Sequence, residues 1–243
     1  MPEGPSIVIL KEAVQAFKGK EVLEAGGYAS IEYDLIVHRR VRDFKSWGKH
    51  FLICFDGFFI RVHLLLFGTY RINERKSAHP SLSLRFPNGE LNFYTSSVQL
   101  AEADPDDAYD WSADVMNEAW SARKASAKLR ERPHMLVCDA LLDQDIFAGV
   151  GNIIKNEVLF RIRVHPESRV GKLPPAKKRA LLKEAVRYSF DFLDWKKAFV
   201  LKKHWLVHNK KTCPRCHIPL QKAWLGKTQR RSFFCNNCQR LYK

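Results

Sequence analysis

Met1-Pro2-Glu3-Gly4-Pro5 opens the sequence and runs directly into an apolar stripe at helical spacing. The stripe predicts a helix to about Lys18 that is capped by Ser6 and buried along one face. Such a helix would hold the residues before it rigidly. A stiff, polar lead-in is the simplest interpretation of the five residues, because proline and glycine are ordinary loop residues. The apolar positions of the stripe are Ile7, Leu10, Val14 and Phe17.

Pro2 also has a chemical interpretation. Removal of Met1 would leave Pro2 with a free secondary amine, a group that no internal residue offers. The pKa of an α-amino group is about 7.7–8, well below that of lysine, so a useful fraction is unprotonated at neutral pH. Such an amine can attack a carbonyl carbon and form an iminium, as lysines do in Schiff-base enzymes. Glu3 is then a candidate for proton transfer beside a covalent nucleophile.

The composition favours a polyanionic partner. The 243-residue chain has a formal charge of +15, from 41 Lys and Arg residues against 26 Asp and Glu residues. Nucleic acid is favoured over an anionic membrane surface. No apolar run is long enough to span a membrane, and Glu3 and Pro5 lie where a signal peptide would be basic. The sequence therefore predicts a protein that is cytoplasmic and nucleoid-associated, or nuclear, and not secreted.

Residues from about 21 to 100 are predicted to form strands. Asp56-Gly57 and Asn88-Gly89 each separate two apolar segments, and both dipeptides favour tight type I′ hairpins. The segment Leu82–Phe86 alternates apolar and polar residues, as a half-buried antiparallel strand does. Several short strands joined by regular turns predict a β-sandwich.

An acidic stretch at 101–114 marks a change of pattern. It contains six acidic residues, one proline and no basic residue, and is a candidate linker or domain edge. After it the apolar spacing becomes helical, with a long helix predicted from Pro174-Pro175. The predicted apolar face of that helix consists of Leu182, Val186, Phe190 and Leu193.

Two cysteine pairs have the spacing of a four-cysteine zinc site: Cys213 with Cys216, and Cys235 with Cys238. Each pair forms a knuckle that supplies half of a tetrahedron. Four thiolate ligands leave no position for water, so the predicted zinc is structural. The basic, aromatic segment between the pairs either inserts an arginine into a DNA groove or forms a protein-interaction ribbon. The remaining cysteines, Cys54 and Cys138, are predicted to be buried, inert thiols.

Three further stretches have both a structural and a functional interpretation. Gly149-Val150-Gly151-Asn152 lies between helical segments, with Asn152 at a cap position, and is either a tight turn or an anion site. Leu64-Leu65-Leu66-Phe67-Gly68 ends an apolar strand and is either core or a wedge that unstacks a duplex. The segment 196–211 interleaves lysines with aromatic residues and is either a solvated face or a phosphate-contacting surface.

These motifs occur in the order found in one family. Met1–Pro5, the run Leu141-Leu142-Asp143-Gln144 leading to the glycine-rich turn, and a four-cysteine ribbon with Gln229-Arg230 before its third cysteine resemble the formamidopyrimidine-DNA glycosylase and endonuclease VIII family. The resemblance covers essentially the whole chain. It implies an α+β multidomain fold: an N-terminal β-sandwich with a flanking helix at 1–113, a helix–two-turn–helix domain at 114–208 and a zinc β-ribbon at 209–243.

The resemblance also implies a bifunctional DNA glycosylase and abasic-site lyase that acts on double-stranded DNA with an oxidised base or an abasic site. Pro2 would attack C1′ of a flipped-out nucleotide, and the iminium would permit β- and then δ-elimination with Glu3 moving protons. Lys49 matches the family's hairpin lysine, which contacts phosphate near the lesion, and joins Pro2 and Glu3 in the implied catalytic set. The other implied DNA contacts are Asn152 and Arg230 on phosphates, and Leu65, Leu66 and Phe67 as the wedge. One structural zinc ion, no redox or nucleotide cofactor, no membrane partner and a monomeric chain are expected.

Two departures from the family pattern bear on the substrate. Ser6 stands where the family usually has a glutamate that assists base excision, and a hydroxyl cannot replace a carboxylate. The stretch 94–100 lacks the arginine found in the formamidopyrimidine branch, which favours the endonuclease VIII branch and oxidised pyrimidines. Two alternatives stay open. One is a damaged-DNA or abasic-site binding protein, or a lyase, that does not excise bases; the other is a zinc-ribbon interaction factor without DNA affinity.

Overall fold

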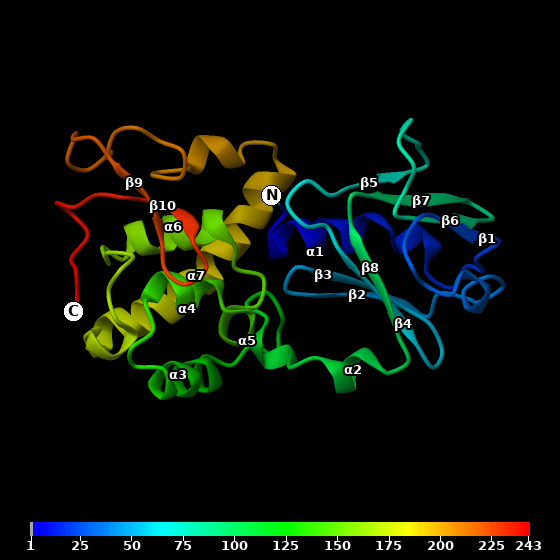
Figure 1. Cartoon of the computed structure of the whole chain (residues 1–243), viewed down its shortest axis with the longest axis horizontal. Helices are drawn as coiled ribbons and strands as arrows, with labels where there is room; N and C mark the ends of the chain where they lie inside the picture. Colours follow the sequence, from blue (N-terminus) through cyan, green and yellow to red (C-terminus); the bar gives the residue numbers. More distant parts are fainter. Residues whose placement is uncertain (1) are drawn as a thin grey trace. The chain divides into compact units, whose positions relative to one another are not determined.

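The computed structural model describes residues 2–243, which form two compact units (Figure 1). The first unit ends at Asp110 and contains the predicted strands, and the second, Trp111–Lys243, contains most of the helices and the cysteine ribbon. The boundary between the units lies inside the acidic stretch 101–114. The finer division into 1–113, 114–208 and 209–243 stays a prediction.

The first unit is built from two four-stranded antiparallel sheets, with the orders β1-β6-β7-β5 and β2-β3-β4-β8. Phe51 and Phe93, one from each sheet, have ring centroids 5.8 Å apart, so the core lies between the sheets. The predicted β-sandwich is confirmed. The strands are β1 (Glu24–Gly26), β2 (Asp43–Trp47), β3 (His50–Cys54), β4 (Phe59–His63), β5 (Thr69–Ile72), β6 (Leu82–Phe86), β7 (Gly89–Tyr94) and β8 (Ser97–Ala101).

Both predicted hairpins are present, but neither has the predicted type I′ turn. That turn needs positive φ at both central residues. In the first hairpin Gly57 has φ 86°, whereas Asp56 is not in the positive-φ region. In the second, Phe86 pairs with Gly89, which makes Pro87 and Asn88 the central residues. Proline fixes φ near −65°, so a type I′ turn is excluded there.

Helix α1 (Gly4–Ala13) begins before the predicted cap. Its N-cap is Glu3, and Pro5 lies in the first turn, where a missing N–H leaves no hydrogen bond unmade. Ser6 is inside the helix and its N–H donates to the carbonyl oxygen of Glu3 at 2.7 Å, so the prediction of Ser6 as the cap is wrong. The predicted stripe is confirmed, because all four of its side chains lie in the core of the first unit. The predicted end near Lys18 is wrong, because α1 ends at Ala13. Two short 3₁₀ segments follow, η1 (Gln15–Phe17) and η2 (Tyr33–Leu35).

The acidic stretch that ends the first unit is tied to β2. It contains the short helix α2 (Pro105–Ala108). Asp104 accepts from Arg42 at 2.8 Å, and Asp106 pairs with Lys45 at 2.6 Å. The predicted linker is therefore an ordered segment held on the sheet by exposed ion pairs.

Helices dominate the second unit, and a two-stranded antiparallel ribbon completes it. Across residues 2–243, no helix is both long and apolar enough to cross a bilayer. The elements are η3 (Trp111–Ala113), α3 (Ala122–Glu131), α4 (Val137–Leu142), α5 (Gln144–Phe147), α6 (Asn152–Arg161), η4 (Val170–Lys172), α7 (Pro175–Lys197), η5 (Leu201–His204), β9 (Gln221–Leu225) and β10 (Arg230–Phe234).

Helix α7 packs most of its predicted face against the core: Leu193 is buried, and Leu182 and Val186 are partly buried there. A neighbouring line of residues is buried more deeply. Phe190 is 45% exposed, whereas Leu193 is buried as predicted. Apolar residues follow helical spacing along two adjacent lines of this helix, so spacing alone did not decide which line faces α6 and α3. The residues buried on α7 are Leu181, Ala185, Tyr188, Ser189, Phe192 and Leu193.

Leu181→Ala should lower the free energy of unfolding of the second unit by about 2–5 kcal/mol, because it deletes fully buried methyl groups and leaves a cavity. Phe190→Ala is the matched control from the predicted face, and it should change that free energy by about 0.5 kcal/mol or less. Urea unfolding followed by tryptophan fluorescence measures both variants. A larger loss in Phe190→Ala than in Leu181→Ala would contradict the observed packing.

Candidate functional site

Glu3 is the most buried member of the predicted catalytic set. It is 0% exposed, which is unusual for glutamate, and it forms the N-cap of α1. Pro2, immediately before it, is partly exposed. Because α1 is anchored in the core through Ile7 and Leu10, the backbone next to Pro2 is fixed while Pro2 itself stays accessible. Ser6 is also buried, and its Oγ has no hydrogen-bond partner among residues 2–243.

Lys49 lies in the tight turn between β2 and β3. Trp47 and His50 pair directly across this turn, so Gly48 and Lys49 are its central residues. Gly48 has φ 55°, in the left-handed region that favours glycine. A glycine at the first central position fits a two-residue hairpin and leaves Lys49 at the tip.

An aromatic cluster supports the base of the Lys49 turn. The indole Nε1 of Trp47 donates to the carbonyl oxygen of Asp110 at 3.0 Å, and the Tyr109 hydroxyl lies 3.2 Å from Nδ1 of His50. Burial, reinforced by the positive charge of Arg61, lowers the pKa of His50 to about 4. His50 is therefore uncharged at neutral pH and can be packed against the indole.

The loop between β4 and β5 exposes three consecutive apolar side chains. Leu65, Leu66 and Phe67 are 46%, 48% and 76% exposed, whereas Leu64 is buried. The loop is closed by a hydrogen bond from Gly68 N to Leu64 O at 2.7 Å, and a Cβ on Gly68 would lie 2.0 Å from that oxygen. The core interpretation of this run therefore holds for Leu64 and is wrong for the three residues after it.

Asn152 is the first residue of α6, and Gly151 rather than Asn152 is the N-cap. Its Nδ2 donates to the carbonyl oxygen of Arg231 at 2.9 Å. Its Oδ1 is buried and makes no hydrogen bond within the described part of the chain. The side chain thus joins the glycine-rich turn to the ribbon strand that begins with Arg230.

The sequence reasoning missed a set of polar side chains on α6 that hold the ribbon. Lys155 is 1% exposed, and its Nζ donates to Ser232 Oγ at 2.8 Å. Asn156 Oδ1 accepts from the N–H of Phe233 at 3.3 Å. The signal was present, because Lys155-Asn156-Glu157 interrupts an otherwise apolar helix. A helix buried on all sides must pair its polar groups.

Glu157 holds the segment that precedes the ribbon. Its buried carboxyl group accepts hydrogen bonds from the N–H groups of Leu206, Val207 and His208. The shortest N···O distance for each of the three is 2.9 Å. Burial raises the pKa of Glu157, and these hydrogen bonds oppose the rise. Burial also lowers the pKa of His208 to about 4, so its Nδ1 can accept from Asn156 Nδ2 at 3.1 Å.

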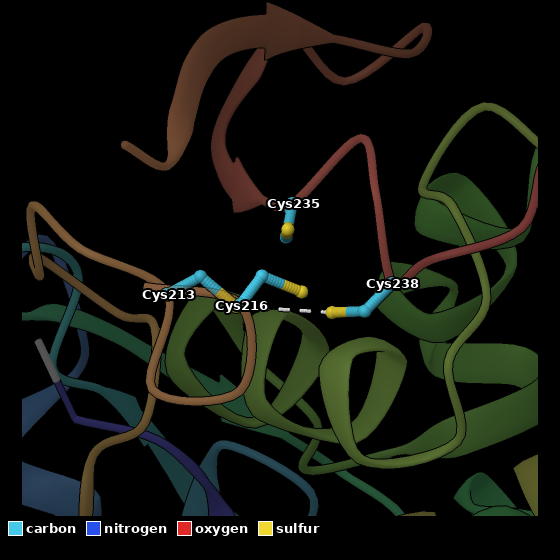
Figure 2. Close-up of side chains that lie close together, drawn as sticks. All are labelled: Cys213, Cys216, Cys235 and Cys238. Carbon is cyan, nitrogen blue, oxygen red and sulfur yellow. Dashed lines mark hydrogen bonds between the residues drawn. The ribbon is translucent and has the colours of Figure 1, made fainter. Parts of the chain in front are cut away.

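The four ribbon cysteines converge on one point (Figure 2). All four sulfur atoms lie within 4.8 Å of one another, and Sγ of Cys213 is 3.8 Å from Sγ of Cys238. Cys213 and Cys235 are buried, whereas the second cysteine of each pair is partly exposed. Four converging thiols with no carboxylate or imidazole among them suit a closed tetrahedral zinc site. This set can hold one zinc ion, which would cross-link the two halves of the ribbon without taking part in a reaction.

The other two cysteines are chemically inert. Cys54 and Cys138 are buried. Burial raises the pKa of Cys54 to about 11 and that of Cys138 to about 12, so neither is a thiolate at neutral pH.

The predicted site residues divide between the two units. In the first, α1 packs against β2 and β3, so the helix that follows Pro2 lies on the sheet that carries Lys49. In the second, α6 packs against β10, which brings Asn152 to the ribbon. The first unit holds Pro2, Glu3, Lys49, Leu65, Leu66 and Phe67, and the second holds Asn152, Arg230, Cys213, Cys216, Cys235 and Cys238.

Several known proteins are similar to this chain in sequence. A family model described as the formamidopyrimidine-DNA glycosylase H2TH domain matches residues 111–188. Endonuclease 8-like 3 of Mus musculus is 30% identical over 205 residues, which cover 81% of this chain and 34% of that protein. Formamidopyrimidine-DNA glycosylase of Vibrio parahaemolyticus is 25% identical, over 98% of this chain and 100% of that protein. The chain therefore spans about a third of the length of the mouse relative (34%) and the whole of the bacterial one.

The chain belongs to the formamidopyrimidine-DNA glycosylase and endonuclease VIII family. The resemblance inferred from its motifs is confirmed. The fold agrees as well: the structure of Lactococcus lactis formamidopyrimidine-DNA glycosylase bound to DNA with an abasic site matches with a TM-score of 0.86 at 20% identity, over 98% of this chain and 99% of that one. In this family member the H2TH match runs from η3 into α7.

Cys235→Ala should abolish zinc binding, because three thiolates no longer close the tetrahedron. The wild-type chain should contain about one zinc ion by atomic emission, as a four-thiolate site requires. Cys54→Ala removes a buried thiol of the first unit and is the matched control, so its zinc content should equal that of the wild type. Equal zinc in Cys235→Ala and wild type would rule out this set of ligands.

Proposed function

We propose that this protein is a bifunctional DNA glycosylase and abasic-site lyase of base-excision repair, which removes oxidised bases with a preference for pyrimidines. The observation that carries the proposal is the pair Pro2-Glu3. Pro2 is partly exposed next to a fully buried Glu3, which lies at the N-cap position of a core helix. The names of the relatives, endonuclease 8-like 3 and formamidopyrimidine-DNA glycosylase, support the same activity. Its place of action is then the nucleus or the nucleoid.

The chemistry begins at the amine of Pro2 once Met1 has been removed. The nitrogen attacks C1′ of a flipped-out nucleotide, the C1′–base bond breaks, and the base leaves with a proton. Opening of the sugar ring gives an iminium between Pro2 and C1′. Loss of a C2′ proton expels the 3′ phosphate, and a second elimination expels the 5′ phosphate. Water then hydrolyses the iminium, and Glu3 transfers protons in these steps.

Charged, polar and exposed apolar side chains would bind the DNA. Lys49 at its turn, Asn152 at the start of α6 and Arg230 at the start of β10 would contact phosphates. The exposed side chains at 65–67 would fill the space that the flipped nucleotide leaves. The chain would act as a monomer on double-stranded DNA, with the segments 1–113, 114–208 and 209–243 as its functional parts. The net charge of +15 supports this partner over a protein-only role.

Borohydride reduction should trap a covalent complex between abasic-site DNA and the chain whose first residue is Pro2, because borohydride reduces the iminium to a stable amine. A chain with a non-removable N-terminal extension is the matched control, since it keeps every residue but converts the amine into an amide. Gel electrophoresis measures the adduct, and peptide mapping should locate it at Pro2. Equal trapping by both chains would disprove the nucleophile.

Ser6 favours a second candidate function. It is buried at the place where the family usually has a glutamate that assists base excision, and its Oγ makes no hydrogen bond within residues 2–243. A neutral hydroxyl provides neither the charge nor the proton of a carboxyl group. The second candidate is therefore an abasic-site lyase that leaves base removal to another enzyme.

The wild-type chain should nick abasic-site DNA at least about tenfold faster than it releases an oxidised pyrimidine, because general acid–base catalysis contributes about 10²–10⁴-fold. Ser6→Glu should narrow the difference by accelerating base release, and Ser6→Ala should change neither rate. Single-turnover assays on thymine glycol and abasic duplexes measure the two steps. Equal rates in the wild type would eliminate the lyase-only candidate, whereas no base release at all, even in Ser6→Glu, would support it.

A further inference from the structure

We propose that Asp139 on α4 is a positioning residue that fixes the tip of the ribbon hairpin and, through it, the direction of Arg230. The inference rests on the proposed function, in which Arg230 contacts a phosphate. Asp139 does not itself contact the phosphate in that proposal, and it belongs to none of the sequence motifs.

The carboxylate of Asp139 receives three hydrogen bonds from the hairpin tip. Oδ2 accepts from the N–H of Lys227 at 2.8 Å. Oδ1 accepts from the N–H of Thr228 at 3.2 Å and from the Thr228 hydroxyl at 3.1 Å. Hydrogen bonds to an ionised acceptor are stronger than those between neutral groups. Two consecutive peptide units of the tip are thereby fixed to a helix of the H2TH region.

The tip is shaped to receive this carboxylate. Gly226 has φ 74°, and a Cβ at this position would lie 2.3 Å from Oδ1 of Asp139. Both the backbone conformation and the space therefore require glycine. Gln229 closes the turn, since its N–H and its side-chain Nε2 donate to the carbonyl oxygen of Gly226 at 3.2 and 2.7 Å.

Arg230 lies between two anchors. It is the first residue of β10 and pairs with Leu225 across the ribbon. On its C-terminal side, Asn152 and Lys155 of α6 hold the strand at Arg231 and Ser232. On its N-terminal side, Asp139 holds the tip. Loss of Asp139 removes three hydrogen bonds from that side, so the backbone of Arg230 can tilt.

The sign of the effect separates positioning from simple electrostatics. Removal of an acidic side chain near a phosphate-binding arginine should strengthen DNA binding if charge alone matters. Removal of a positioning residue should weaken it. Asp145→Ala is the matched control, because Asp145 is an exposed residue of the same unit whose hydrogen bonds, from its N–H to Asp143 and from Lys128 to its carbonyl oxygen, are made with its backbone.

The experiment measures the dissociation constant for a duplex with a tetrahydrofuran abasic analogue as a function of salt. Asp139→Ala should weaken binding by about tenfold and reduce the salt slope by about one, as the loss of one phosphate contact does. Asp145→Ala should bind as tightly as the wild type or slightly more tightly. Asp139→Asn should be intermediate, because its amide oxygen can still accept from Thr228. All variants should keep the zinc content of the wild type.

Arg230→Ala and the double variant Asp139→Ala/Arg230→Ala complete the test. The double variant should bind no more weakly than Arg230→Ala, because Asp139 acts only through Arg230. Binding by Asp139→Ala as tight as that of Asp145→Ala, or loss of its zinc, would overturn the positioning role. Unchanged binding and slope in Arg230→Ala would instead refute the proposed phosphate contact, so the two failures are distinguishable.

Discussion

Burial of Lys155, Asn156 and Glu157 on α6 is the constraint on which the second unit depends. The amino group of Lys155 and the carboxyl group of Glu157 are expensive to remove from water unless each is hydrogen-bonded. Their partners are backbone and hydroxyl groups of the ribbon and of the segment before it. Such bonds are directional, whereas apolar contact is not, so α6 specifies where β10 lies and not merely that it packs. Any shift of the ribbon would leave several buried groups without partners at once.

The ribbon needs this external support because its own core is small. Within residues 2–243 the buried cluster around it consists of Phe160, Val207, Cys213, Phe233 and Cys235, with Leu206 and Leu220 packed against it. A two-stranded hairpin is marginally stable in water by itself. A zinc ion bound by the four thiols would join the segments that flank the two strands. Helix α6 holds strand β10, and Asp139 holds the hairpin tip. Metal and helix therefore stabilise different parts of one short element, and neither can replace the other.

Local patterns in the sequence predicted the features that depend on neighbouring residues. The cysteine spacing, the alternation in β6 and the stripe of α1 are all read over a few positions, and the structure agrees with each. The α7 face was predicted only in part: Leu182, Val186 and Leu193 pack against the core, whereas Phe190 is exposed. Two lines of apolar residues compete on this helix, and only its tertiary neighbours decide which is buried more deeply. The pairings of Glu157 and Asp139 could not be predicted for a related reason, although the polar run on α6 was visible in the sequence. Their partners lie 49 to 51 and 88 to 89 positions away, and no local pattern encodes such pairs.

The candidate reactive and binding groups lie on different helices, strands and turns, but all are held in the same way. Each lies on backbone that buried neighbours fix: Pro2 next to buried Glu3, Lys49 on a turn supported by Trp47 and His50, and Arg230 between α6 and α4. Groups held in this way lose little conformational entropy when they bind a ligand. More of the free energy of each contact therefore contributes to affinity or rate. Burial keeps two histidines of the surrounding structure, His50 and His208, neutral at pH 7, with pKa values of about 4. Among the described lysines and arginines Lys155 is buried and the others are at least partly exposed, so most of the positive charge can act on a polyanion over a distance.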